Sequence, residues 1–359
     1  MKFGPFMLWQ VPDGRRPGEV ITRETDLLVK GEEMGYDAAF IAEHHFCDYS
    51  PAGAPAVALA YLAGRTKRIK LGTAVSVLPL HHPLTLAEEW ATVDVYSGGR
   101  LELGVGRGYN WFEFDSMGID LMENTGRFVE CLAIMRKAWT EERVSYEGRF
   151  YSVHDTEVIP KPLQKPHPHM WYASIRKESV RMCGNLGLGY CAIFDAGPQD
   201  LVERRRVWTE TAKDAGYSDQ WIEETAQNSP TQRVVWVAET DRQAERELQG
   251  MLKSFSRLAE LCAWPGTGYP GRRLPLDRVQ YPERLKQGWL QARFDWEQLK
   301  RDHCVLVGSP KTVRLQLEEL VAQAPLEYML MWTSIGGPQW EDQERCLRLF
   351  ADKVMPHFK

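Results

Sequence analysis

Residues 35–46, with the sequence GYDAAFIAEHHF, set the pattern that decides the fold. Their largely apolar part, residues 36–42, predicts a buried β-strand. A helix expected from about residue 22 to residue 34 precedes the strand and stops at Gly35, because glycine readily adopts the backbone conformation found just after a helix. The stretch therefore predicts a helix, a turn and a strand, followed by a polar strand end that begins at Glu43.

The same alternation of short β-branched or aromatic runs with longer helical segments continues in both directions. It argues for repeated βα units around a parallel sheet. The other expected strands are residues 2–9, 69–77, 100–105, 170–173, 190–194, 233–237 and 328–332. The other expected helices are residues 55–63, 84–96, 127–139, 177–185, 200–215 and 340–354.

Length and rhythm favour one domain over residues 1–359, because a chain of 359 residues with 43% hydrophobic content can bury one large core. Residues 264–302 interrupt the alternation with clustered Pro, Gly and Arg and scattered aromatic residues. Long loops in compact folds are often active-site lids. We expect a loop or lid inserted before the last strand, and a plain surface excursion stays open as the alternative.

Charge and apolar segments argue against several classes of partner. The net charge of -5 comes from acidic and basic residues mixed along the whole sequence, so no nucleic-acid surface is expected. No segment reaches the roughly 18 continuous apolar residues of a membrane span, and the first ten residues lack the features of a signal peptide. The seven cysteines are scattered without metal-ligand spacing, which indicates reduced, mostly buried thiols. A cytoplasmic protein is therefore expected.

Residues 43–46 (EHHF) lie where the second expected strand ends, which is the functional edge of a parallel barrel. Neighbouring residues of an extended chain point to opposite sides, so we do not expect His44 and His45 to bind one metal ion together. No carboxylate cluster suggests a metal either, and no metal site is predicted. The pair is either structural or catalytic, because an imidazole with a pKa of roughly 6.5 can exchange a proton near neutral pH.

Gly104, Gly106 and Gly108 surround Arg107 at the end of the fourth expected strand. Their spacing resembles a dinucleotide fingerprint, but Tyr109 replaces the third glycine and no helix is expected directly afterwards, so we reject that interpretation. The glycines would let the backbone approach a flat ligand, and Arg107 offers a charged fork for a phosphate. An ordinary glycine-rich turn with a solvated arginine stays open.

Two further strand ends are candidates for ligand contacts. Residues 173–179 (ASIRKES) pass from a strand into a helix, where free N–H groups bind phosphate and Arg176 and Ser179 add donors. The alternative is ordinary helix capping by Ser174. Residues 73–75 (TAV) are small enough to lie under an aromatic ring, although they equally suit an inward layer of a barrel.

Together these motifs resemble the luciferase-like flavin monooxygenases, the family that includes the α-subunit of bacterial luciferase. The resemblance runs nearly from end to end, and several spaced motifs in the right order are more specific than any one of them. They are residues 1–4 (MKFG), 43–46 (EHHF), 72–74 (GTA), 78–79 (LP), 82–83 (HP), 99–100 (GR), 107–108 (RG), Gly118, Gly308 with Pro310, and 354–356 (VMP).

The resemblance implies an α/β fold, a (β/α)₈ TIM barrel, that accepts reduced FMN from a separate flavin reductase. With O₂ as co-substrate it would form a C4a-(hydro)peroxyflavin and oxidise a small organic substrate. His44 matches the family's catalytic histidine beside the flavin. His45 matches a neighbouring histidine tied to a carboxylate, and Glu113 stands at the position of that carboxylate.

The resemblance also implies where the flavin binds. Arg107 and the turn of residues 175–179 match the phosphate-binding positions, and Ala74 with Val75 matches a non-prolyl cis peptide beneath the flavin ring. The implied cofactor-binding residues are Thr73, Ala74, Val75, Arg107, Ser174, Ile175, Arg176 and Ser179.

The sequence departs from luciferase at the strand before the arginine. Gly106 stands where luciferase has its reactive cysteine, and Asn110 and Trp111 also differ, so cysteine catalysis is not expected and the substrate pocket should differ. Hydroxylation, Baeyer-Villiger oxidation and desaturation stay open as reaction outcomes. Two alternative functions are an F420-dependent oxidoreductase on the same barrel and a flavin-binding protein without turnover. A homodimer is expected.

Overall fold

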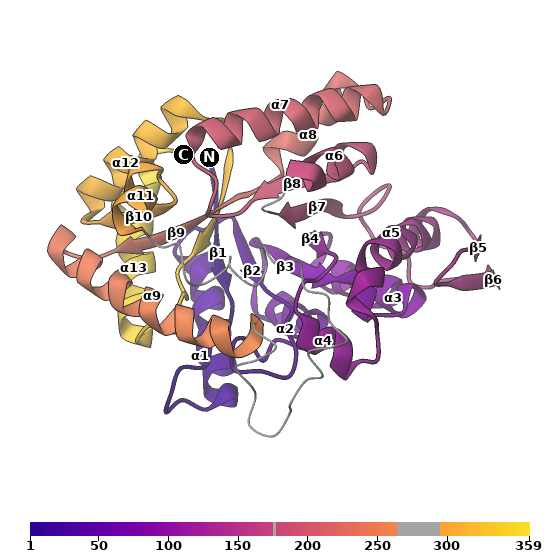
Figure 1. Ribbon diagram of the computed structural model, residues 1–359, viewed down its shortest axis with the longest axis horizontal. Helices are drawn as coiled ribbons and strands as arrows, with labels where there is room; N and C mark the ends of the chain where they lie inside the picture. Colours follow the sequence, from indigo (N-terminus) through magenta and orange to yellow (C-terminus); the bar gives the residue numbers. More distant parts are fainter. Residues whose placement is uncertain (175–176, 264–294) are drawn as a thin grey trace.

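The computed structural model describes residues 1–174, 177–263 and 295–359. Within these residues, parallel strands form one curled sheet that is surrounded by helices (Figure 1). Its strands are β1 (Lys2–Met7), β2 (Ala38–Ile41), β3 (Lys70–Val77), β4 (Leu101–Gly106), β7 (His169–Ser174), β8 (Gly189–Ala192), β9 (Thr231–Val237), β10 (Val305–Gly308) and β11 (Tyr328–Trp332). Their hydrogen-bonded order is β10-β9-β11-β1-β2-β3-β4-β7-β8. Strands β5 (Val144–Glu147) and β6 (Ser152–Thr156) form a separate antiparallel hairpin.

Helices fill the connections between the strands. They are α1 (Pro17–Glu33), α2 (Pro55–Arg65), α3 (Pro83–Ser97), α4 (Trp111–Ser116), α5 (Asn124–Thr140), α6 (Lys177–Asn185), α7 (Pro198–Asp214), α8 (Asp219–Gln227), α9 (Asp241–Ala263), α11 (Trp296–Arg301), α12 (Pro310–Gln323) and α13 (Trp340–Lys353). Short 3-10 turns are η1 (Leu78–Leu80), η2 (Leu121–Glu123) and η3 (Met355–His357).

Proline marks the start of several helices, including α1, α2, α3, α7 and α12. A proline in the first helical turn costs no hydrogen bond, because the N–H groups there have no partner within the helix, and its fixed φ suits the helix. Helix α1 accordingly begins at Pro17, earlier than the expected start near residue 22.

The expected complete (β/α)₈ barrel is confirmed only as a curled parallel sheet. Strands β8 and β9 contact each other, but the hydrogen-bonded order of the described strands runs from β10 to β8 without closing. Strand β10 pairs with residues 234–237 of β9 and so occupies part of the edge of β9 that closure of the barrel would need. Beside it, the buried Arg233 donates to the carbonyl of Ala196 at 2.7 Å, so a side chain bridges the seam.

The chain holds more helices and strands than were predicted from its sequence. Strand β10 with helix α12 was missed, and so were the long helix α9, helices α4 and α8, and the β5–β6 hairpin. The expected insertion, residues 264–302, lies before the last strand β11, and the unpredicted β10 and α12 stand between them. The end of the insertion forms helix α11, capped by Asp295, and residues 264–294 lie outside the described residues.

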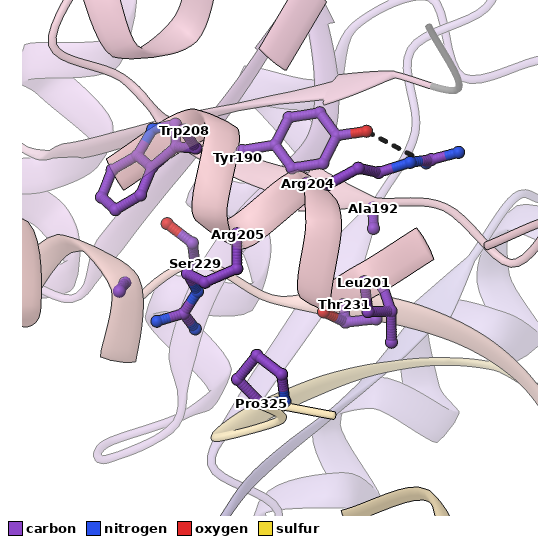
Figure 2. Close-up of a pocket in the computed structure, with 10 residues that line it drawn as sticks. Tyr190, Ala192, Leu201, Arg204, Arg205, Trp208, Ser229, Thr231 and Pro325 are labelled. Carbon is purple, nitrogen blue, oxygen red and sulfur yellow. Dashed lines mark hydrogen bonds between the residues drawn. The ribbon is translucent and has the colours of Figure 1, made fainter. Parts of the chain in front are cut away.

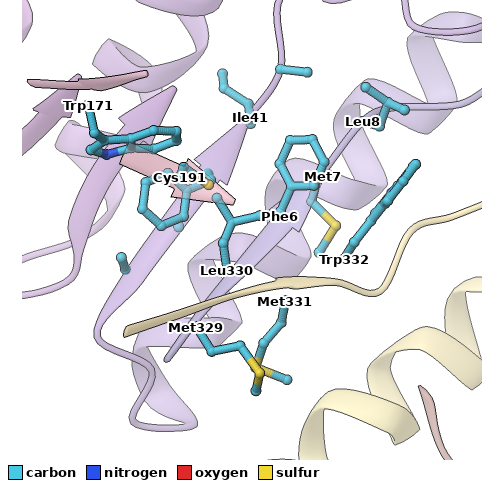
Figure 3. Packing of buried hydrophobic residues seen from close by; sticks show 14 of the residues in the cluster. Phe6, Met7, Leu8, Ile41, Trp171, Cys191, Met329, Leu330, Met331 and Trp332 are labelled. Atoms are coloured by element: carbon cyan, nitrogen blue, oxygen red, sulfur yellow. The ribbon is translucent and has the colours of Figure 1, made fainter. Parts of the chain in front are cut away.

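The sheet is buried on both faces, as expected of parallel strands covered by helices. Every residue of β2, β4 and β11 is buried. Side chains from β1, β2, β7, β8 and β11 pack together, with the rings of Phe6 and Trp332 5.9 Å apart (Figure 3). Cys47, Cys131, Cys183, Cys191, Cys304 and Cys346 are buried and form no disulfide bond, as predicted. No helix in the described part of the chain is long and apolar enough to cross a membrane.

Candidate active site

Most of the predicted site residues lie at one edge of the sheet. Strands β2, β3, β4 and β7 are successive neighbours in the sheet and run parallel, so their carboxyl ends meet at that edge. His44 follows β2, Ala74 and Val75 lie late in β3, Arg107 follows β4 and Ser174 ends β7. The topology thus brings together segments that are far apart in sequence.

His44 forms a buried pair with Glu113. The Nδ1 atom of His44 lies 2.8 Å from Oε1 of Glu113, and the same oxygen accepts the backbone N–H of His45 at 3.0 Å. Helix α4 delivers the carboxylate, and it begins here because the side chain of Asn110 caps the N–H of Phe112 at 3.2 Å. Glu113 is only 1% exposed, so its position is fixed.

The environment of His44 favours its protonated form. Burial alone would lower the pKa of the imidazole, but the charge of Glu113 and its hydrogen bond outweigh burial and raise the pKa above its usual 6.5. Two tyrosine rings approach the imidazole edge-on, Tyr49 at 5.0 Å and Tyr109 at 5.9 Å between ring centres. With Nδ1 engaged by Glu113, the remaining nitrogen Nε2 is the atom available for proton exchange.

The side chain of His45 belongs to a different cluster, so its expected pairing with Glu113 was wrong. Only the backbone N–H of His45 reaches that carboxylate. The Nε2 atom of His45 lies 3.0 Å from Oε1 of Glu43, because adjacent residues of the extended segment point to opposite sides. His81, after η1, places its Nε2 atom 2.6 Å from the same oxygen. We call Glu43, His45 and His81 the Glu43 triad.

The carboxylate of Glu43 carries a stable negative charge. Its second oxygen accepts the backbone N–H of Val77 at 2.9 Å and the hydroxyl of Ser76 at 3.3 Å. Burial would raise the pKa of Glu43, but the hydrogen bonds and charges of His45 and His81 outweigh it and lower the pKa to about 2. His81 was not among the predicted site residues, because folding brings it in from 38 residues after Glu43.

The peptide between Ala74 and Val75 is cis, as predicted. Both residues are only partly buried, although β3 lies between two neighbouring strands and is otherwise almost completely buried. Thr73 is fully buried, and its hydroxyl donates to the carbonyl of Gly104 at 2.7 Å. Strand β3 is thus more open at Ala74 and Val75 than at the residues on either side of them, and Thr73 belongs to the packed part.

The glycines around Arg107 serve packing within the protein. A Cβ atom at Gly104 would collide with the carbonyl of Thr73 and the ring of Trp171, and one at Gly106 with the side chain of Val75. Gly108 has a φ of +73°, and a Cβ there would meet Phe114. The expectation that these glycines open the backbone to a flat ligand was therefore wrong at Gly104 and Gly106, because neighbouring strands fill the space.

Arg107 is half-buried and donates to the hydroxyl of Thr125 at 3.1 Å. Among the described residues it has no acidic partner, so its charge is free to meet an anion. Ser174 is half-buried at the end of β7, and Ser179 is buried in the first turns of α6. Ile175 and Arg176, two of the predicted phosphate-binding residues, lie outside the described residues.

An open pocket lies elsewhere, under helix α7 (Figure 2). It is lined by Tyr190, Ala192, Leu201, Arg204, Arg205, Trp208, Ala226, Ser229, Thr231 and Pro325. The hydroxyl of Tyr190 donates to the carbonyl of Ser174 at 2.5 Å and accepts from Arg204 at 3.1 Å. Arg205 is paired with Glu327 at 2.8 Å. Since these polar groups have partners and no predicted catalytic residue lines the pocket, we do not assign it to the chemistry.

The fold is a curled parallel α/β sheet with the candidate residues gathered at its strand ends, and the sequence gives the family. Residues 1–327 match the luciferase-like monooxygenases. The chain belongs to the luciferase-like monooxygenase family.

Curated relatives carry monooxygenase names. The oxygenase component of the flavin-dependent trigonelline monooxygenase of Acinetobacter baylyi is 32% identical over 48% of this chain and 49% of that one. The alkanal monooxygenase alpha chain of Photorhabdus laumondii is 29% identical over 60% of each chain. The chain spans about half the length of the first curated relatives it matches.

Solved structures share the fold over the full chain. A monooxygenase from Streptomyces bottropensis aligns with a TM-score of 0.84 at 23% identity and covers 100% of both chains. The oxygenating constituent of 3,6-diketocamphane monooxygenase from Pseudomonas putida, in complex with FMN, aligns with a TM-score of 0.75 at 20% identity, over 100% of this chain and 99% of that one. The F420-dependent tetrahydromethanopterin reductase of Methanopyrus kandleri reaches 0.67 at 19% identity, with the same coverage. At these identities the likeness establishes the fold alone.

Proposed function

We propose that this chain is the oxygenase component of a two-component flavin-dependent monooxygenase. It would take reduced FMN from a separate flavin reductase and use O₂ to oxidise a small organic substrate. The observation that carries the proposal is the buried His44–Glu113 pair, which lies at the same sheet edge as the cis peptide and Arg107. The names of the relatives support it, because they include the oxygenase component of a flavin-dependent monooxygenase.

The residues at this edge fit FMN. Ala74 and Val75 are partly open in the second half of a strand that is otherwise largely buried, which suits a flat ring lying against them. Arg107 is a cation without an acidic partner among the described residues, and it can bind a phosphate through two parallel N–H bonds. Ser174 and Ser179 adjoin the start of α6, where the helix dipole favours an anion. Ile175 and Arg176 would complete this phosphate site.

Reduced FMN, when bound, supplies the electrons that activate O₂. The protein's own part is proton handling, orientation and exclusion of water. Glu113 holds the imidazole of His44 in one orientation through Nδ1, which leaves Nε2 to donate or accept a proton. Tyr49 and Tyr109 flank the ring and limit access of water to it. His45 supports the strand end from the opposite side through Glu43.

Two experiments separate this function from its alternatives. The first compares anaerobic binding of reduced FMN and of F420 to the full-length protein, and we expect clearly tighter binding of FMN. The second couples the protein to an FMN reductase and measures O₂ consumption and oxygenated product across a panel of small organic substrates. Preferential F420 binding with hydride transfer would identify an F420-dependent oxidoreductase. Binding of FMN with no substrate-dependent product would instead identify a flavin-binding protein without turnover.

A further inference from the structure

The Glu43 triad gathers three potential metal ligands from two segments of the chain. Glu43 and His45 follow β2, whereas His81 follows η1 beyond β3. One ligand atom from each side chain lies within 4.8 Å of the other two. Glu43 and His45 are buried, and the side chain of His81 is 24% exposed. The three atoms therefore converge on one small, partly accessible volume.

We propose that the Glu43 triad binds a divalent transition metal ion of the Zn²⁺ type. Imidazole nitrogen suits Zn²⁺ and Fe²⁺, and two histidines with one carboxylate form an established ligand set for both. Mg²⁺ and Ca²⁺ prefer sites built from oxygen atoms, so they fit this set poorly. The proposal is independent of flavin binding, because it concerns the opposite side of the strand end from His44.

Neighbouring groups hold the triad in place before any ion arrives. Val77 and Ser76 fix one carboxylate oxygen of Glu43, which turns the other oxygen towards the two imidazoles. Gly53 lies close to His45, since a Cβ atom at Gly53 would be only 3.1 Å from Nδ1 of that ring. Supporting contacts of this kind orient ligands and typically change metal affinity by about 10–100-fold when they are lost.

Distances and charge are compatible with a bound dication. The two histidine nitrogens lie 3.0 and 2.6 Å from the carboxylate oxygen, and ligand atoms around a tetrahedral Zn²⁺ lie about 3.3 Å apart when each is about 2.0–2.1 Å from the metal. A small outward shift of the partly exposed His81 would provide the difference at that ligand. Glu43 supplies one negative charge, and Glu89 is near enough to His81 to add a second.

A metal at this position would act as a structural cross-link. It would tie the segment after β2 to the segment after β3, and His44 lies between the two metal ligands contributed by the first segment. The imidazole of His44 faces Glu113, so the metal itself would not contact the proton-exchanging ring. The cross-link would instead hold the backbone that positions His44.

The test uses the full-length protein after treatment with a chelator and transfer to metal-free buffer. Titration calorimetry with Zn²⁺ should show one equivalent bound, and Co²⁺ should give the visible absorption of a four- or five-coordinate site. His81→Ala should weaken Zn²⁺ binding by at least about 10-fold, since it removes a direct ligand. His154→Ala is the matched control, because His154 is exposed on β6 and belongs to another part of the fold.

The results decide between a metal site and a purely hydrogen-bonded cluster. Loss of binding in His81→Ala with unchanged binding in His154→Ala supports the metal site. The proposal is wrong if the wild-type protein takes up no stoichiometric Zn²⁺, or if His81→Ala binds it as tightly as wild type. Circular dichroism checks folding of each variant. Should His81→Ala not fold, Glu43→Gln is measured in the same way, and the wild-type titration with Zn²⁺ and Co²⁺ gives a decision without any variant.

Discussion

His44 and His45 are adjacent residues with the same side chain, yet they belong to two different arrangements. His44 shares the carboxylate of Glu113 with one backbone N–H, and its ring lies edge-on to the rings of Tyr49 and Tyr109. His45 and a second imidazole converge on Glu43, whose other oxygen is also fully engaged. The first arrangement leaves an atom available for chemistry, whereas the second uses its groups to hold the fold.

The difference comes from the segments that each side of the strand end meets. Helix α4 brings one carboxylate to the side of His44, and η1 brings one imidazole to the side of His45. Residue type therefore does not distinguish the two histidines, whereas their hydrogen-bond partners do. We expect substitutions on the two sides to have separable effects on rate and stability.

His44→Ala should give the largest effect. Removing a positioned acid or base typically lowers the rate by roughly 10²–10⁴-fold, so product formation in the FMN-reductase-coupled assay should fall by about that factor. FMN binding and thermal stability should stay near wild type, because the proposed phosphate-binding residues are untouched. Exposed His154→Ala serves as the control. A wild-type rate in His44→Ala would show that the histidine is structural and would remove the contrast with His45.

Arg107→Ala should weaken FMN binding more than riboflavin binding. A hydrogen bond to a charged group contributes about 1.5–3 kcal/mol, which corresponds to roughly 10–150-fold in affinity for the phosphate-bearing flavin. Riboflavin lacks the phosphate and should lose little. Titrations of both ligands into wild type and variant measure the difference. Equal losses for the two flavins would place the phosphate elsewhere.

Glu43→Gln should act on stability more than on chemistry. It leaves the buried imidazole of His45 and the partly exposed imidazole of His81 without their carboxylate, which should lower the free energy of unfolding by about 1–3 kcal/mol at neutral pH. The pKa of Glu43 is lowered to about 2, so the wild-type contribution is present above the unfolded pKa of roughly 4.3 and is lost as pH falls towards 2. Urea denaturation at pH 7 and at pH 3 should therefore show a smaller difference between wild type and variant in acid.

The control for this stability effect is Glu88→Gln, a change at an exposed residue of α3. It should alter the unfolding free energy little at either pH. A Glu43→Gln protein as stable as wild type at pH 7 would show that the Glu43 triad does not stabilise the fold.

Much of the fold was predictable because the residues that begin and end its helices act locally in the sequence. Gly35 and the prolines mark helix ends and starts, and the apolar strands of the first half follow in regular order. Helix α9 was missed although Leu248, Leu252, Phe255 and Ala259 repeat at helical spacing and are buried. Closure of the barrel could not be predicted from the sequence. It depends on which strand, distant in sequence, forms hydrogen bonds with the edge of β9, and in the structure that strand is β10.

The site was predictable where a candidate residue directly follows a predicted strand, as His44 and Arg107 do. Glu113 was identified by family resemblance, but its partner was not, because the choice between two adjacent histidines depends on how α4 packs. His81 was missed, although it lies just beyond the carboxyl end of β3 and the same strand-end rule points to it. Sequence locates the edge of the sheet, and packing decides which side chains meet there.

Glu113→Gln should produce the smallest and most specific effect, a shift in pH dependence. The charge of Glu113 is the main contribution that raises the pKa of His44, and burial opposes it. Without that charge burial prevails, so the pKa of His44 should fall. If neutral His44 acts as the base, the acidic limb of the kcat/KM profile should move to lower pH, whereas a purely structural role for Glu113 would change the rate without moving the limb.

The same pair has a linked effect on stability. Because the pKa of His44 is raised by folding, its contribution is fully present below the unfolded value of roughly 6.5 and is lost as pH rises through the folded pKa. Glu113→Gln should therefore lower stability more at pH 5.5 than at pH 9, the opposite trend from Glu43→Gln. Glu113→Asp keeps the charge and should retain part of both effects. Two results together would contradict this prediction: an acidic limb of the kcat/KM profile that does not move in Glu113→Gln, and a loss of stability that is the same at both pH values. Glu113 would then only fill space, and the different partners of His44 and His45 would not give the two histidines different roles.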